Sequence, residues 1–166
     1  MLPDSITKLQ NLQGLNLTDC ERLKQLPEDI KKLISLRNLR ILGCVSLTHM
    51  PQGLGQLTCL RYLSTFIVAE DNGVSKHSGG VGELQSLKNL RDDFCITNLR
   101  YVKNPASEFG AADLKEKQHL QRLTLAWKMD KIFDDDDDGM SLEELRPHLN
   151  LKQLKVFGSG RLAFPS

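Results

Sequence analysis

Five consecutive aspartates, Asp134 to Asp138, are the densest group of potential metal ligands in the sequence. With the following Gly139 they match the first six positions of a calcium-binding loop, in which alternate carboxylates ligate the cation. The twelfth position of such a loop requires a bidentate carboxylate, and here it is Leu145. Adjacent carboxylates also repel one another. We therefore interpret residues 134–139 as a solvated acidic loop, with weak and unselective cation binding as the alternative.

Other reactive side chains are scattered along the chain. The four histidines, at positions 49, 77, 119 and 148, include no pair with the i, i+4 spacing of a helical metal site. The four cysteines, at positions 20, 44, 59 and 95, form no C-x-x-C motif, and Gly80-x-Gly82 lacks the third glycine of a dinucleotide-binding loop. We find no pattern of nucleophile and base. The sequence therefore predicts that this chain is not an enzyme and holds no metal or cofactor.

Composition and charge exclude several further classes. The 166 residues carry a net charge of +1, which provides no global attraction to nucleic acid or to an anionic membrane. No segment approaches the roughly 18 apolar residues of a membrane span, and the N-terminus lacks the pattern of a secretory signal. The cysteine spacing suits a reducing compartment. We expect a cytoplasmic protein without an integral membrane segment.

The elements that would position any binding residues follow from a repeat with a step of 24 residues. Leu2-Pro3 recurs as Leu26-Pro27 and as Met50-Pro51. The apolar residues that follow recur at the same step: Ile6, Leu9, Leu12 and Leu15, then Ile30, Leu33, Leu36 and Leu39, then Leu54, Leu57, Leu60 and Leu63. Each copy approximates L-P-x-x-I-x-x-L-x-x-L-x-x-L-x-L-x-x-C, which is a leucine-rich repeat.

This repeat predicts a solenoid, because one copy cannot enclose a core and must bury its leucines against the copies on either side. The alternating Leu15 and Leu17 have the period of a half-buried strand, whereas the segment L-P-x-x-I-x-x-L suits a 3₁₀ turn. We expect an α/β leucine-rich-repeat horseshoe, with a parallel β-sheet on the concave face and short helices, 3₁₀ turns and loops on the convex face. Cys20 and Cys44 should point inward where the strands end.

The chain divides into three parts. Residues 1–68 hold the regular 24-residue repeats, and residues 69–83 form a polar, glycine-rich insertion. Residues 84–166 hold irregular repeats with the acidic loop 134–139, and Leu142, Leu145 and Leu149 lead into the last of them. We count about six strand positions in all. Since the chain opens within a repeat, we expect a piece of a longer protein with uncapped ends.

The residues that flank the buried pair of each strand should form the binding surface, because solenoids usually bind through the concave face. From this register the predicted protein-binding residues are Asn38, Arg40, Leu42, Tyr62, Ser64, Phe66, Arg122, Thr124, Lys155 and Phe157. Arginine and aromatic residues in such positions are typical anchors of a protein interface. A register shift of one residue would turn such side chains inward.

Three runs of sequence carry a more specific resemblance. They are LRYLSTFIV at 60–68, GELQSLKNLR at 82–91 and LKEKQHLQRLTLAW at 114–127. These runs resemble the leucine-rich-repeat region of plant intracellular disease-resistance proteins of the coiled-coil, nucleotide-binding (NB-ARC), leucine-rich-repeat class. The likeness extends over nearly the whole chain.

The resemblance implies a function and partners. The resemblance implies that the leucine-rich-repeat region senses a pathogen effector, either directly or through a guarded host protein. It also implies that this region holds the NB-ARC module inactive until then. ADP or ATP is implied only for that module, since this sequence contains no G-x-x-x-x-G-K-[S/T] motif. The implied partners are therefore proteins and not nucleic acid. The alternative is a substrate-recruiting leucine-rich-repeat adaptor of a ubiquitin ligase, which would need an F-box-like helical segment upstream.

Overall fold

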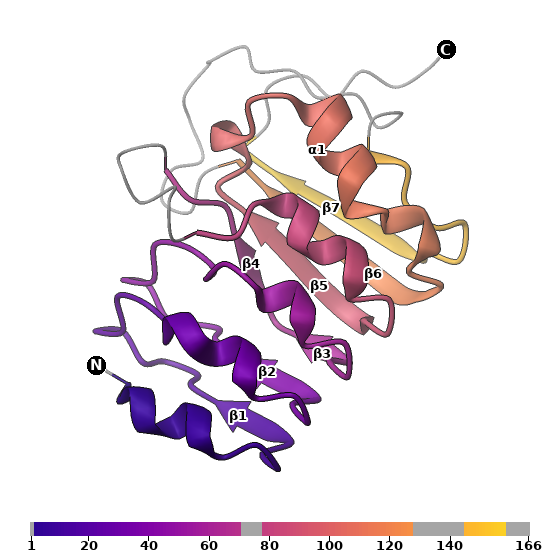
Figure 1. Ribbon diagram of the computed structural model, residues 1–166. Helices are drawn as coiled ribbons and strands as arrows, with labels where there is room; N and C mark the ends of the chain where they lie inside the picture. The colour runs from indigo at the N-terminus through magenta and orange to yellow at the C-terminus, as the bar shows by residue number, and fades with distance from the viewer. Residues whose placement is uncertain (1, 71–77, 128–144, 159–166) are drawn as a thin grey trace, which may run out of the picture.

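The computed structural model describes residues 2–70, 78–127 and 145–158. Figure 1 shows two layers, with the strands side by side in one layer and the short helices in the other. From Asp4 to Leu63 a helical turn alternates with a strand, and neighbouring strands run parallel in both sheets. This arrangement is the one that stacked copies of a leucine-rich sequence require, because each copy supplies one segment to each layer.

The strands form two parallel sheets in chain order. The first contains β1 (Gly14–Asn16), β2 (Asn38–Arg40) and β3 (Tyr62–Leu63), and the second contains β4 (Phe66–Ile67), β5 (Arg91–Thr97), β6 (His119–Ala126) and β7 (Gln153–Phe157). In the first sheet Leu15 is the partner of Leu39, and Leu39 is the partner of Leu63. The 24-residue step therefore places equivalent leucines beside one another.

The helical layer consists mainly of 3₁₀ turns. They are η1 (Asp4–Lys8), η2 (Glu28–Lys32), η3 (Leu54–Gln56), η5 (Val81–Ser86), η6 (Leu99–Tyr101) and η7 (Leu114–Glu116). One α-helix, α1 (Pro105–Ala112), begins with proline at its first position, where no backbone N–H is needed. Packing of α1 against η5 continues the helical layer above the second sheet.

The core lies between the two layers and is almost entirely aliphatic. The repeat leucines Leu33, Leu36, Leu57 and Leu60 have no solvent exposure (0%). Full burial of one leucine side chain contributes about 1.5–3 kcal/mol. Since these leucines recur in every regular copy, the energy of the fold is spread over the contacts between consecutive copies.

Backbone contacts between copies also depend on glycine. The Glu83 carboxylate accepts hydrogen bonds from the backbone N–H groups of Gly53 (2.8 Å) and Gly55 (2.7 Å), which open η3 in the preceding copy. A carboxylate at this end satisfies donors that a helix cannot pair internally. A Cβ atom at Gly55 would lie 2.6 Å from the Glu83 carbonyl oxygen. Glycine at this position therefore permits the close approach of the two copies.

The prediction that Phe66 lies on the exposed side of the sheet is wrong. A bend at Ser64 separates β3 from β4. The alternation of buried and exposed residues ends there, since residues 65–68 are all buried, and Phe66 becomes the partner of the buried Ile96 in β5. Phe66 is completely buried as a result.

Two further expectations are corrected. Cys44 is buried and its Sγ donates to the carbonyl of Leu17, 3.0 Å away, but Cys20 is exposed because no described copy lies beneath it. Leu145 is buried, but Leu149 is 99% exposed because it lies in a turn that His148 and Leu151 close by a backbone hydrogen bond.

The acidic loop 134–139 and Leu142 lie outside the described residues.

Within the ranges that the structure describes, no helix combines the length and apolar character needed to cross a bilayer.

Lys117 is the exceptional residue of the core. It follows η7 at the position where Leu33, Leu57 and Leu87 follow η2, η3 and η5. Its side chain is completely buried, and its Nζ donates to the carbonyls of Leu84 (2.6 Å) and Leu87 (3.2 Å) in the preceding copy. Burial lowers the pKa of Lys117 from 10.5 to about 8.

This shifted pKa predicts a specific pH dependence of stability. Between about pH 8 and pH 10.5 the unfolded chain binds more protons at Lys117 than the folded chain. The free energy of unfolding should therefore rise across this interval, with a slope approaching about 1.4 kcal/mol per pH unit from this group. Urea denaturation at several pH values measures the slope. Lys117→Met should remove this increment, whereas Lys115→Met, at an exposed position, should retain it. Identical slopes in both variants would contradict the account.

Candidate protein-interaction surface

The outward side of the two sheets, here called the sheet face, carries nine of the ten predicted binding residues. Asn38, Arg40 and Leu42 are exposed at β2, and Leu42 leaves 63% of its surface in solvent. Tyr62, Ser64 and Thr124 are half-buried. Arg122, Lys155 and Phe157 are exposed on β6 and β7. These nine residues are at least partly exposed and Phe66 is not, and the role of the nine in binding stays a prediction.

Contacts between neighbouring strands order part of this face. The Arg40 guanidinium lies over the Tyr62 ring, with 4.9 Å between its central carbon and the ring centroid. Such a cation–π contact contributes about 0.5–1 kcal/mol at an exposed site. Ser64 Oγ accepts a hydrogen bond from the backbone N–H of Ile41 at 2.9 Å. Ser64 thus joins β2 to the bend after β3, which gives it a structural role as well as a place on the face.

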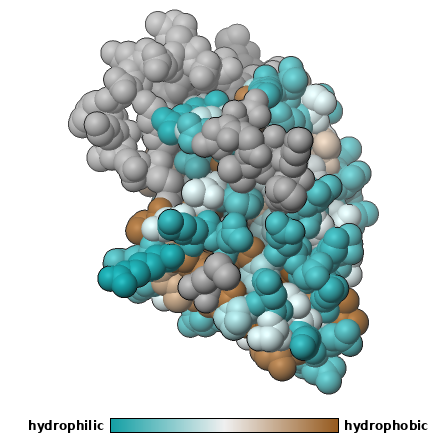
Figure 2. Space-filling view, turned by 60° about the vertical axis from the view of Figure 1, so that its left-hand side comes forward, coloured by the Kyte–Doolittle hydropathy of each residue, from teal (hydrophilic) through white to brown (hydrophobic). Residues whose placement is uncertain are grey.

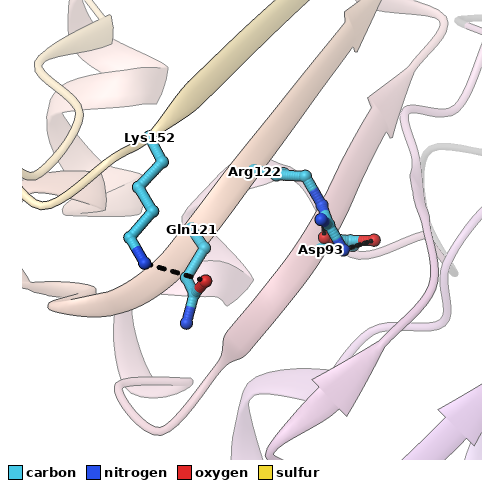
Figure 3. Close-up of polar contacts among 4 residues, drawn as sticks. All are labelled: Asp93, Gln121, Arg122 and Lys152. Carbon is cyan, nitrogen blue, oxygen red and sulfur yellow. Dashed lines mark hydrogen bonds and ion pairs between the residues drawn. The ribbon is translucent and has the colours of Figure 1, made fainter.

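Arg122 forms a two-pronged ion pair with Asp93 of the neighbouring strand (Figure 3). Its Nη2 donates to Asp93 Oδ2 at 2.8 Å, and its Nε donates to the other carboxylate oxygen. The hydrogen bond and charge of Asp93 raise the pKa of Arg122. Because both side chains are exposed, the pair adds little to stability. Its effect is to fix the direction of Arg122 and to neutralise Asp93.

Sequence reasoning missed a second set of residues beside the sheet face. A row along the edge where the strands begin contains the residue at or just before the start of β1, β2, β3, β5 and β7, together with Gln121 of β6: Gln13, Arg37, Arg61, Arg91, Gln121 and Lys152. The backbone N–H of Arg61 donates to Arg37 (2.8 Å), and that of Arg91 donates to Arg61 (2.9 Å). We call Arg37, Arg61, Arg91 and Lys152 the basic row. The detectable signal was the dipeptide Leu-Arg at the same place in three successive copies.

The described residues show no arrangement suited to metal or thiol chemistry. Across the described ranges, no three His, Cys, Asp or Glu side chains are grouped to hold a metal ion. Cys95 is half-buried on the sheet face, and burial raises the pKa of its thiol. A thiol with a raised pKa is a poor nucleophile at neutral pH. Cys95 is therefore poorly suited to thiol chemistry on this face.

Exposed apolar residues on the described surface are dispersed. Figure 2 shows a largely hydrophilic face on which the hydrophobic residues form small, separate groups. The exposed large apolar side chains are Leu9, Ile34, Leu42, Val45, Leu149 and Phe157. Isolated residues of this kind are normal on soluble proteins. Apolar contact on the sheet face is therefore limited to local anchors such as Leu42 and Phe157.

The stacked parallel strands, the short helices and the repeat leucines together define an α/β leucine-rich-repeat protein. A family model described as R13L1/DRL21 LRRs matches residues 81–166, just over half of the chain. The chain belongs to this family of leucine-rich repeats.

The chain is also similar to disease resistance proteins of Solanum bulbocastanum. It is 40% identical over 113 residues to putative disease resistance protein RGA4 and 42% identical over 103 residues to putative disease resistance protein RGA1. It is 39% identical over 105 residues to disease resistance protein RGA2. These matches cover 62–63% of this chain but only 10% of each relative, so the chain spans about a tenth of their length. The resemblance to plant disease-resistance proteins is confirmed.

The different burial of two phenylalanines yields a prediction. Phe66→Ala removes a completely buried ring and should lower the free energy of unfolding by about 3–5 kcal/mol. Phe157→Ala, at a side chain that is 56% exposed, should lower it by less than about 1 kcal/mol. Chemical denaturation of both variants measures the difference. Equal losses would show that Phe66 lies at the surface.

Proposed function

We propose that this chain is the leucine-rich-repeat segment of an intracellular plant immune receptor that acts in the defence response. Its sheet face binds a protein, either a pathogen effector or a host protein that the receptor guards. The observation that carries the proposal is the similarity to three disease resistance proteins at 39–42% identity. The cation–π contact between Arg40 and Tyr62 supports the choice of the sheet face as the binding surface, because arginine and tyrosine are typical anchors of protein interfaces.

The proposal includes the architecture of the whole segment. About six repeats form a horseshoe whose inner surface is the sheet face and whose ends are uncapped. The regular repeats occupy residues 1–68, an insertion occupies 69–83, and irregular repeats with the acidic loop 134–139 occupy 84–166. The receptor is cytoplasmic, and the segment itself performs no catalysis.

In the receptor the segment has a second partner within the same protein. It contacts the NB-ARC module and holds that module inactive until the effector or guarded protein is sensed. ADP or ATP binds in the NB-ARC module and not in this segment. The NB-ARC module and the effector or guarded protein therefore compete for the surface of the repeats, and this competition controls the receptor.

The test begins with the full reading frame, obtained by mapping both ends of the cDNA. We expect the frame to continue upstream into an NB-ARC module with a P-loop. Arg40→Glu in the complete receptor, expressed in leaf tissue, should cause cell death without the pathogen or abolish resistance, because it reverses a charge on the sheet face.

The matched control is Lys8→Glu, which makes the same charge change at an exposed residue of η1 in the helical layer. It should leave the response unchanged. An upstream F-box-like segment in place of NB-ARC would contradict the receptor assignment. Wild-type behaviour of both Arg40→Glu and Tyr62→Ala would contradict the assignment of the sheet face.

A further inference from the structure

Within the residues that the structure describes, no salt bridge involves the arginines of the basic row. Arg37 and Arg61 are exposed and Arg91 is half-buried. Among the described residues, the salt bridges are Lys32 with Asp29 and Arg122 with Asp93, so none involves these three arginines. Arg91 Nε is buried and makes no hydrogen bond. The three guanidinium groups therefore keep most of their donors for an external acceptor.

Charge is distributed differently in the helical layer. There η1 carries Asp4 in its first turn and Lys8 in its last, and η2 carries two acidic residues followed by Lys31 and Lys32. In these two 3₁₀ turns the acidic side chains precede the basic ones, and the opposite charges compensate one another. The net charge of the chain is only +1, and the basic row is a local excess that the rest of the molecule balances.

A polar hollow lies at one end of the basic row. It has a volume of about 360 Å³, and Arg91 and Lys152 both line it. Most of the other lining residues can donate hydrogen bonds: Gln118, His119, Gln121 and Asn150. Lys152 Nζ lies 3.4 Å from Gln121 Oε1, a long contact that leaves the ammonium accessible (Figure 3). The hollow therefore offers two cations and several donors against the single carboxylate of Asp92.

We propose that the basic row binds an acidic segment of a protein partner. An extended polypeptide lies across the starts of the strands, where its Asp and Glu side chains pair with the arginines and one carboxylate enters the hollow. Guanidinium groups bind carboxylates through two parallel hydrogen bonds, which favours this ligand. The inference rests on the proposed function of protein binding and adds the chemistry of the partner.

Nucleic acid fits the same surface less well. Asp92 interrupts the positive charge at β5, where its carboxylate would repel a phosphate backbone. Domains that bind nucleic acid usually have a strongly basic isoelectric point, whereas the isoelectric point of this chain is about 7.7. A peptide can place neutral residues opposite this aspartate, but a phosphate backbone carries charge at every step.

Peptide binding tests the proposal. Neighbouring strands lie about 4.8 Å apart, so a labelled extended peptide of about twelve residues spans the row. The probe alternates Glu and Ser, and its neutral analogue carries Gln in place of Glu. Fluorescence anisotropy should show that the chain binds the acidic probe, that salt weakens this binding, and that the neutral analogue binds at least about tenfold more weakly.

Arg37→Glu combined with Arg61→Glu should weaken binding of the acidic probe by about tenfold or more. The control combines Lys8→Glu with Lys24→Glu, which changes the net charge equally at two exposed residues outside the row. Circular dichroism melts establish that both double variants remain folded. Equal losses in the two double variants, or no binding by the wild-type chain, would overturn the proposal. If an oligothymidine of similar length binds more tightly than the acidic probe, and the Arg37→Glu and Arg61→Glu double variant loses this binding, the ligand of the basic row is nucleic acid and not an acidic peptide.

Failure of this proposal is distinguishable from failure of the proposed function. If the acidic probe does not bind but Arg40→Glu still alters the receptor response, the sheet face binds a partner of other chemistry. If the acidic probe binds the row and the complete reading frame encodes no NB-ARC module, the basic row is an acidic-peptide site in a protein of another kind.

Discussion

The structure depends on the burial of leucine side chains between consecutive passages of the chain through its two layers. Leu36 and Leu60 occupy equivalent positions in neighbouring copies and are both completely buried, yet a single copy is too small to enclose either of them. Stacking therefore sets the register of the parallel strands. The same stacking arranges the exposed residues in rows, because equivalent positions of successive copies must lie side by side.

The proposed function depends on this arrangement of rows. The helical layer contains local charge pairs such as Asp29 and Lys32, whereas Arg37, Arg61 and Arg91 at the edge of the sheets form no salt bridge within the described residues. Concentration of one charge along a rigid surface gives direction and specificity to association with a protein of opposite charge. The rigidity comes from the leucine core, so recognition and stability use different side chains of the same copy.

Sequence reasoning succeeded where the 24-residue step is regular and failed where the chain departs from it. Leu15, Leu39 and Leu63 could be placed in register because their spacing is constant. The bend after β3 could not be predicted, and it reversed the orientation of Phe66. The burial of Lys117 could have been predicted, because this residue lies midway between Leu114 and Leu120 at the three-residue spacing of the repeat leucines. It was missed because a charged residue is not expected in a core.

The central claim is that stability resides in contacts between neighbouring copies, and a double-mutant cycle tests it most directly. Leu39→Ala and Leu63→Ala alter partners in adjacent strands, whereas Leu39→Ala and Leu123→Ala alter residues of different sheets. From urea denaturation we predict a coupling energy of about 0.5–3 kcal/mol for the first pair and additivity within about 0.5 kcal/mol for the second. Additivity in both pairs would contradict the account.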